Sequence, residues 1–247
     1  MKIVASYSNK GGVGKTASSV NLAHGLAQSG LRVLLCDLDP QGASGFYFRV
    51  KPSKKLTDER FFTDVKRFTD SIRGSDYENL DILPSNLTFR DFDVFLSRMK
   101  NSRSRLHKAL KSVASDYDIV LLDCPPNLST LSENVFASAD AILVPVIPTT
   151  LSERSFEQLL EFFAETKLSK KKILGFFSMV QGTKKLHAET IARMRQDYPK
   201  RLLDIAVPFS TDVEKMGVHR APVATFAASS PAARSYDALR HELQQRL

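Results

Sequence analysis

Cysteine is scarce in this sequence and long apolar runs are missing, and each shortage excludes a class of protein. Only Cys36 and Cys124 occur among 247 residues, at a separation that matches no metal-ligand pattern. We expect both thiols to be small buried strand residues, kept reduced in the cytosol. No stretch of about 18 apolar residues exists, so the sequence predicts no transmembrane helix.

The first residues also lack the apolar segment and cleavage site of a secretory signal, because a predicted strand begins after one lysine. Internal repeats and low-complexity stretches are absent as well. A chain of 247 residues that is 43% hydrophobic can bury a sizeable core. These features predict a cytoplasmic protein whose residues 1–247 form a single domain.

Acidic residues are fewer than basic ones, 27 against 35, which gives a formal net charge of +8. Residues 94–115 contain no acid but six lysines and arginines, and further lysine clusters occur at 167–172 and 184–185. A surface of this charge attracts polyanions through counterion release, whatever their sequence. We therefore expect a nucleic-acid-binding surface.

The most informative stretch is the glycine-rich loop at residues 10–16, between a predicted strand and a predicted helix. Backbone N–H groups and the positive helix end at such a junction bind phosphate oxygens. Lys15 is expected to reach the β- and γ-phosphates, and the Thr16 hydroxyl to ligate Mg²⁺. Asn9 replaces the first glycine of the strict P-loop pattern, and Lys10 is an additional lysine that the phosphate cradle does not need. The loop curls on three glycines, Gly11, Gly12 and Gly14.

Apolar strand-like runs alternate with helical patterns along the whole chain. The predicted strands are residues 3–7, 33–36, 80–83, 119–122, 141–146, 173–180 and 202–207, and the helical patterns include 17–28, 89–114, 153–166 and 187–197. This alternation is typical of βαβ units, and predicts an α/β fold: a doubly wound, mostly parallel sheet with helices on both faces, as in P-loop NTPases. Residues 46–74 are the least regular and are expected to form a surface excursion.

Three aspartates follow predicted strands at the edge where ligands of such sheets bind. Asp37 and Asp39 come at the end of the second strand. Asp123 ends the apolar strand of a Walker B pattern and is expected to hold Mg²⁺ through a water. Two prolines after Cys124 stiffen a loop that is expected to respond to the γ-phosphate.

Three segments resemble the nucleotide motifs of the ParA/MinD-type deviant Walker ATPases, in the same order and spacing. They are KGGVGKTASSVNLA at 10–23, VLLCDLDPQGAS at 33–44 and DIVLLDCPP at 118–126. The resemblance continues through residues 144–150 and through 207–208 with the loop that follows. Within this family the chain is most similar to ParA-like partitioning ATPases.

The resemblance implies an ATPase that uses ATP and Mg²⁺, weakly active until a partner stimulates it. Asp39 would orient the attacking water, Asp37 would lie near Mg²⁺ and Thr16, and Lys10 would cross a dimer interface to the partner's phosphates. The catalytic residues implied are Lys10, Lys15 and Asp39, and the metal residues are Thr16, Asp37 and Asp123. The ATP-binding residues implied are Lys10, Gly11, Gly12, Val13, Gly14, Lys15, Thr16, Ala17, Met179 and Pro208.

The same resemblance implies an ATP-bound homodimer that binds DNA non-specifically on the nucleoid. A ParB-like or other small partner would activate it, and the cargo would be a plasmid, a chromosome or a protein complex. Phe209 and Asp212 stand where arginines of chromosomal ParA proteins contact DNA. The replacement candidates for DNA binding are Lys184, Lys185, Arg193, Arg195, Lys215 and Arg220. No helix-turn-helix region precedes the first strand, so we expect no repression of an operon.

Other functions of this fold fit the sequence less well. A MinD-like membrane ATPase would end in a cationic amphipathic helix, whereas residues 233–247 carry a narrow apolar stripe and read as a helix docked on the core, so no stable membrane association is expected. A DNA-coating adaptor that uses ATP only as a latch would not need Asp39. An iron–sulfur carrier would need paired cysteines. A metabolic ligase of the dethiobiotin or cobyrinate type would not need Lys10 or the basic surface.

Overall fold

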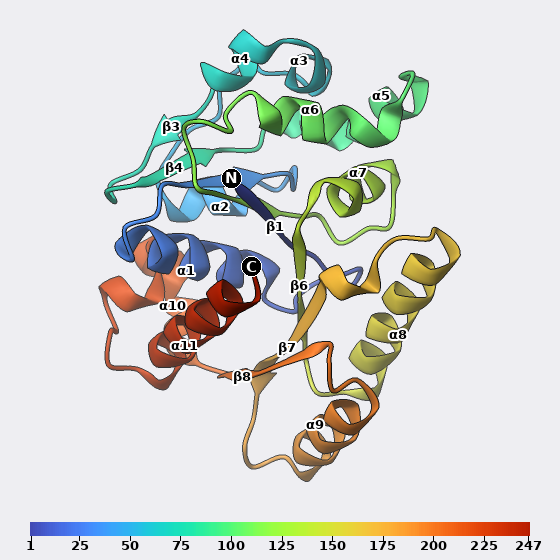
Figure 1. The fold of residues 1–247 in the computed structure, drawn as a ribbon. Coiled ribbons are helices and arrows are strands. Elements are labelled where there is room, and N and C mark those ends of the chain that lie inside the picture. The colour runs from blue at the N-terminus through green and yellow to red at the C-terminus, as the bar shows by residue number, and fades with distance from the viewer.

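Every apolar run that the sequence predicts as a strand is a strand in the computed structural model, which describes residues 1–247. The eight strands form one sheet in the order β3-β4-β2-β5-β1-β6-β7-β8, and all neighbours are parallel except β3 and β4 (Figure 1). They are β1 Lys2–Ser6, β2 Val33–Asp37, β3 Arg73–Gly74, β4 Leu80–Leu83, β5 Ile119–Asp123, β6 Ala141–Val146, β7 Ile173–Val180 and β8 Leu202–Pro208. The predicted α/β fold class is confirmed.

Eleven α-helices connect the strands and cover both faces of the sheet (Figure 1). They are α1 Lys15–Gln28, α2 Ala43–Tyr47, α3 Asp58–Thr63, α4 Val65–Thr69, α5 Phe92–Arg98, α6 Arg105–Lys111, α7 Thr130–Ser138, α8 Thr150–Glu165, α9 Lys185–Asp197, α10 Thr211–His219 and α11 Pro231–Arg246. Short 3₁₀ turns occur at Leu87–Asp91, Ser102–Ser104, Lys170–Lys172 and Val223–Thr225.

Alternate residues of each central strand point to opposite faces, and so build two separate cores. Ile3 and Ala5 of β1 belong to a cluster of 37 buried residues that includes side chains from α3 to α9. Val4 belongs to a cluster of 25 that includes side chains from α1, α10 and α11. Each large apolar side chain buried in this way stabilises the fold by about 1.5–3 kcal/mol.

The register of the central strands brings the sequence motifs together. Strand β5 lies between β2 and β1, with Asp123 opposite both Asp37 and Ser6. The P-loop leaves the carboxyl end of β1, and the turn after Asp37 leaves the same edge of the sheet. This edge is therefore where the candidate site lies.

The helix predicted over residues 89–114 is wrong as a single element. The chain forms a 3₁₀ turn, α5, a second 3₁₀ turn and α6 instead. Met99 is extended, with φ −86° and ψ 141°, and Asn101 is left-handed, with φ 55°. Asparagine tolerates that conformation, and one such residue is enough to break the helix.

The interpretation of residues 46–74 as a surface excursion is also wrong. The segment folds into α2, α3 and α4, whose ends are fixed in part by side-chain caps from Thr57 and Asp64. Four of its five phenylalanines enter the two cores, and Phe48, Phe61 and Phe68 are 2% exposed or less, whereas Phe46 is 49% exposed. The polar residues between these phenylalanines interrupt the apolar pattern, which is divided among three short helices. The sequence therefore did not indicate helices here.

The carboxyl-terminal helix α11 docks on the core as predicted. Tyr236, Leu239 and Leu243 are buried and pack in the cluster that also contains residues of α1 and β8. None of the helices combines the length and the apolar character needed to cross a bilayer.

Candidate nucleotide-binding site

The P-loop is shaped by glycines in conformations that other residues avoid. Gly12 has φ +70° and Gly14 has φ +93°, while a Cβ atom at Gly11 or Gly12 would meet nothing within 4 Å. Gly14 also precedes α1 and leaves its first N–H groups without a side-chain cap. Open space above uncapped N–H groups suits phosphate oxygens, so the loop fits the triphosphate that the sequence predicts.

Replacing Gly14 is expected to damage this loop far more than replacing Gly11. A Cβ at Gly14 would lie 3.0 Å from the Ser178 hydroxyl, on a backbone that disfavours any side chain. The Gly14→Ala variant should lose about 1–3 kcal/mol of unfolding free energy and bind nucleotide at least about tenfold more weakly. Urea unfolding of the nucleotide-free protein measures the first effect, and calorimetric titration measures the second. Gly11→Ala is the control, with unfolding free energy within about 0.5 kcal/mol of wild type; equal losses in both variants would contradict the account.

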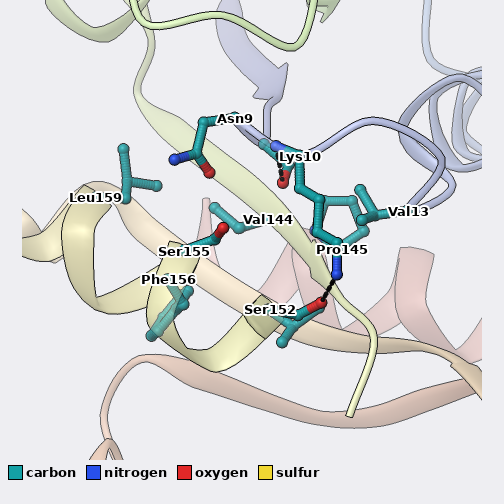
Figure 2. Close-up of a pocket in the computed structure, with 11 residues that line it drawn as sticks. Asn9, Lys10, Val13, Val144, Pro145, Ser152, Ser155, Phe156 and Leu159 are labelled. Atoms are coloured by element: carbon teal, nitrogen blue, oxygen red, sulfur yellow. Dashed lines mark hydrogen bonds between the residues drawn. The ribbon is translucent and has the colours of Figure 1, made fainter. Parts of the chain in front are cut away.

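The two lysines of the loop make different contacts, and the contact of Lys10 with Ser152 is drawn in Figure 2. Lys15 is 7% exposed, and its Nζ donates to the carbonyl oxygen of Lys10 at 3.1 Å. Burial lowers the pKa of Lys15, although the charge of Asp123 acts in the opposite direction. The Nζ of Lys10 instead donates to the Ser152 hydroxyl of α8 at 3.0 Å. The space beneath Lys10 measures about 10 Å³, room for a single water at most. Lys10 thus lies at the rim of the site, and its amine contacts helix α8 instead of the P-loop.

The two carboxylates predicted to lie near the metal are buried side by side. Asp37 and Asp123 are 0% and 1% exposed and face each other in register on β2 and β5. Ser44 of α2 joins them, because its N–H donates to Asp37 Oδ2 at 3.0 Å and its hydroxyl donates to Asp123 Oδ2 at 2.8 Å. The Ser19 hydroxyl of α1 donates to Asp123 Oδ1 at 3.1 Å. Two helices therefore converge on one carboxylate pair.

This pair is electrostatically unfavourable without a cation. Burial raises the pKa of Asp123 to about 6, against hydrogen bonds from Ser44, Thr16 and Ser19 that lower it. Burial also raises the pKa of Asp37 well above its usual range, and the charge of Asp123 raises it further. A divalent cation would relieve both effects. Mg²⁺ takes one or two carboxylates and fills its shell with water and phosphate, so the site fits Mg²⁺ although no larger cluster of ligating residues exists.

Asp39 lies in the turn beyond the end of β2. Its N–H donates to Asp37 Oδ1 at 3.1 Å, and its own Oδ1 accepts from the N–H of Gln41 at 3.0 Å. The side chain is partly exposed, on the edge of the sheet where the P-loop begins. Its role in orienting water stays a prediction.

The residues predicted to flank the base lie together. Gly14, Ala17, Met179 and Pro208 line one pocket of about 60 Å³, closed on another side by Tyr236 of α11. Met179 has φ +53° at the end of β7, and its methyl group lies 3.8 Å from the Cβ position of Gly14. Residues far apart in sequence thus meet beside the P-loop.

The six residues predicted to bind DNA do not form one cluster. They are divided between the region of α9 and the region of α10, and five of them make internal contacts. Those contacts are Lys185 with Glu189, Arg193 with Glu153, Arg195 with the Asp204 carbonyl, Lys215 with Asp212 and Arg220 with the Phe46 carbonyl. Lys184, at the start of α9, has no ion pair. DNA binding by these residues stays a prediction.

Sequence reasoning missed the serines that support the site. Ser44 ends the second motif quoted above, and Ser19 lies one helical turn beyond Lys15. The i, i+4 spacing on α1 was a usable signal for Ser19. No sequence pattern indicated Ser152, because its contact with Lys10 joins residues that are 142 positions apart in the chain.

Known proteins that resemble this chain agree with a nucleotide-binding site of this kind. A family model described as an AAA domain matches residues 1–176. The sporulation initiation inhibitor protein Soj of Bacillus subtilis is 28% identical over 243 residues, which cover 95% of each chain. The chromosome partitioning protein ParA of Myxococcus xanthus is 27% identical over 250 residues, which cover 99% of this chain and 88% of that protein.

Solved structures share the fold over nearly the full length. An ATP complex of a McdA variant from Cyanothece has a TM-score of 0.85 at 18% identity, covering 99% of this chain and 96% of its own. Cobyrinic acid a,c-diamide synthase from Mycobacterium smegmatis, with bound ATP analog and magnesium, has a TM-score of 0.82 at 24% identity, covering 99% and 95%.

Proposed function

Because the chain belongs to the ParA-like partitioning ATPases of the AAA domain family, we propose that it is an ATP-driven dimerising switch that positions cargo on DNA. Residues 1–247 act as one domain in the cytoplasm, on the nucleoid. The observation that carries the proposal is Lys10, a P-loop lysine whose amine rests on α8 instead of in its own phosphate cradle. We infer that Lys10 binds the phosphates of a partner subunit.

The chain's own groups divide the work of ATP hydrolysis. The α1 N-terminus and the open backbone of Gly11 and Gly12 bind the phosphates, and Lys15 neutralises the β- and γ-oxygens. Thr16, Asp37 and Asp123 hold the metal, directly or through water. Mg²⁺, when bound, supplies positive charge to the β- and γ-phosphates.

Asp39 and Lys10 complete the set of groups that act on the γ-phosphate. Asp39 orients the attacking water, and Lys10 of each subunit stabilises the charge that develops on the partner's ATP. Met179 and Pro208 flank the adenine. Hydrolysis removes the γ-phosphate that joins the subunits, so the dimer separates and releases DNA.

DNA binding by the dimer rests on the distribution of charge. Residues 49–111 contain 15 lysines and arginines against 9 acids, which accounts for six of the eight net positive charges. Their helices α3 to α6 form one end of the molecule (top of Figure 1). A cleft of about 370 Å³ in this region has an entirely polar lining: Ser53, Lys54, Lys55, Arg67, Asp70, Ser71 and Arg73. Such a surface suits DNA phosphates of any sequence.

ATPase assays with and without DNA, with DNA binding followed against salt, test the proposal. We expect DNA binding only with ATP, and hydrolysis that DNA and a small partner protein stimulate. If liposomes bind and stimulate while DNA does neither, the membrane-cycling alternative replaces this one. The burial of Tyr236, Leu239 and Leu243 on the core argues against that alternative, because α11 has no free apolar face.

Two matched double variants locate the DNA surface. Lys54→Ala with Lys55→Ala removes two charges from the polar cleft, and Lys184→Ala with Lys185→Ala removes two near α9. A pair that contacts phosphates lowers the slope of log affinity against log salt by about 2, whereas a pair facing bulk solvent leaves it unchanged. An unchanged slope in both would remove both surfaces from the proposal.

A further inference from the structure

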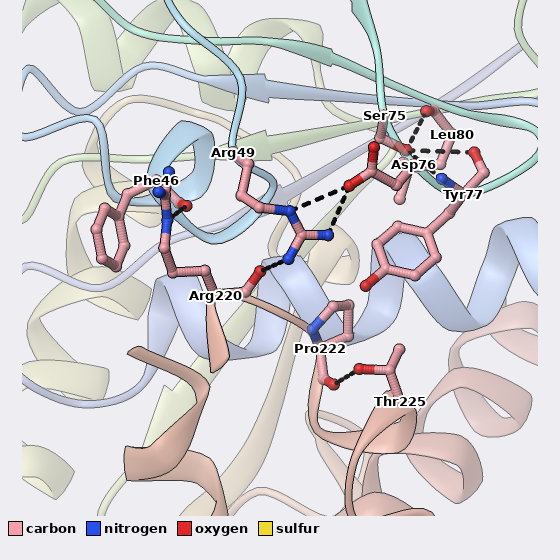
Figure 3. Close-up of polar contacts among 9 residues, drawn as sticks. All are labelled: Phe46, Arg49, Ser75, Asp76, Tyr77, Leu80, Arg220, Pro222 and Thr225. Atoms are coloured by element: carbon pink, nitrogen blue, oxygen red, sulfur yellow. Dashed lines mark hydrogen bonds and ion pairs between the residues drawn. The ribbon is translucent and has the colours of Figure 1, made fainter. Parts of the chain in front are cut away.

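Helix α2, which follows the turn of Asp39, is fastened at its far end to the end of α10 (Figure 3). The Arg220 Nε donates to the Phe46 carbonyl oxygen at 3.0 Å, and the guanidinium lies 4.6 Å from the centre of the Phe46 ring. In return, the Arg49 Nη1 donates to the Arg220 carbonyl oxygen at 2.8 Å. We call these reciprocal contacts of Phe46, Arg49 and Arg220 the α2 clasp.

The clasp has a further anchor in the turn before β4. Arg49 binds the Asp76 carboxylate through Nε at 3.1 Å and Nη2 at 2.6 Å, so its guanidinium joins three segments (Figure 3). Both groups are partly exposed, with side chains 40% and 66% accessible, so the pair adds little to stability by itself. Its value lies in orienting Arg49.

Both clasp arginines have a backbone conformation that normally belongs to glycine. Arg49 has φ +60° and Arg220 has φ +50°, each just beyond the end of a helix. Glycine is the usual residue there, and a side chain costs about 1–2 kcal/mol. Arg49 and Arg220 thus both adopt an unfavourable backbone conformation, and the side chain of each binds the segment of the other. This combination indicates that function constrains these two residues.

The position of α2 determines how the metal carboxylates are held. Ser44, in the same five-residue helix as Phe46, donates to Asp37 and Asp123 through its backbone and its hydroxyl. A rotation or shift of so short a helix would move both donors at once. The clasp is a polar contact at its other end.

We propose that Arg220 is a positioning residue for ATP hydrolysis, which acts through Phe46 to hold α2 and Ser44 against the carboxylate pair. This inference rests on the proposed ATPase function. It gives Arg220 a role other than binding DNA, because its Nε and the face of its guanidinium are engaged with Phe46.

The charge-preserving variant Arg220→Lys tests the inference, because lysine keeps the positive charge but lacks the Nε donor and the planar face. We expect kcat to fall about tenfold, the magnesium midpoint of activity to rise at least about threefold, and the KM for ATP to change less than about twofold. The control is Arg32→Lys, since Arg32 makes comparable bonds to Asp118 and the Ser115 carbonyl beyond the opposite edge of the sheet. That variant should lose stability alone.

A fluorescence reporter follows the clasp without relying on activity. The chain has no tryptophan, and Phe46 is 49% exposed, so Phe46→Trp places a single tryptophan under the Arg220 guanidinium. Emission should shift to longer wavelength, with lower anisotropy, when Arg220→Ala is added. An unchanged spectrum would overturn the clasp.

The kinetic outcomes separate this inference from the function it rests on. Wild-type protein that hydrolyses no ATP under any condition refutes the proposed function. An active wild type with an Arg220→Lys variant of normal kcat and magnesium midpoint refutes the inference alone. Loss of DNA affinity in Arg220→Ala, with those two quantities unchanged, would assign Arg220 to DNA instead.

Discussion

The Lys10→Ala variant is expected to bind ATP with nearly normal affinity and to lose stimulated hydrolysis by about 10³-fold or more. A cationic group supplied by a partner subunit contributes about 10³–10⁵ to the rate of phosphoryl transfer. The Lys10 amine contacts Ser152 in the monomer, while Lys15 occupies the loop's own cradle. Removing Lys10 therefore removes the group that acts between subunits and leaves the one that acts within a subunit.

Calorimetric titration with ATP and a steady-state phosphate-release assay measure the two sides of this expectation. Lys2→Ala is the matched control, because Lys2 is an exposed lysine at the start of β1, far from the loop that follows the end of this strand. It should behave as wild type in both assays. A Lys10→Ala variant that hydrolyses ATP at the wild-type stimulated rate would contradict the proposed role of Lys10.

The Asp39→Ala variant is expected to bind ATP, to lose about 10²–10⁴ of the hydrolysis rate, and to accumulate as a DNA-bound dimer. A carboxylate that orients or activates water contributes that order of rate. The position of Asp39 supports this role, since the residue lies at the edge of the sheet where the P-loop begins. Unlike Asp37 and Asp123, it is not part of the buried carboxylate pair. A variant that still binds ATP but cannot hydrolyse it accumulates in the ATP-bound state that precedes hydrolysis.

Asp39→Asn separates the charge of this residue from its part in the turn. Its amide oxygen can still accept from the N–H of Gln41, so the turn should persist while the negative charge is lost. Both variants should therefore be inactive, with DNA-bound dimers measured by gel shift and cross-linking. Normal hydrolysis in Asp39→Ala would mean that another group positions the water. That result would favour neither the ATP-driven dimerising switch nor the DNA-coating adaptor that uses ATP only as a latch.

The strands and the P-loop could be predicted because their signals are local. Strands buried on both faces read as unbroken apolar runs, and residues 141–146 and 173–180 were predicted with the bounds that the structure shows. The glycines around Lys15 specify a loop that few other functions require. The carboxylates could be placed because parallel strands bring their carboxyl ends to one edge.

The parts that escaped prediction depend on contacts between distant residues. Asn101 breaks the helix expected over 89–114, although its neighbours carry a helical pattern. The clasp contacts between Phe46, Arg49 and Arg220 span more than 170 residues, so the sequence suggested Arg220 only as a DNA-binding candidate. Propensity and spacing describe a residue's neighbours along the chain, but not the partner it meets in the fold.

The molecular mass of the Asp39→Ala variant in solution, measured by light scattering with and without Mg-ATP, shows whether ATP drives dimerisation through Lys10. We predict a monomer of 27.6 kDa without nucleotide and twice that mass with Mg-ATP. Adding Lys10→Ala to the same chain should return it to the monomer mass while ATP stays bound. A chain that remains monomeric with Mg-ATP, or a dimer that forms regardless of nucleotide and of Lys10, would contradict the ATP-driven switch.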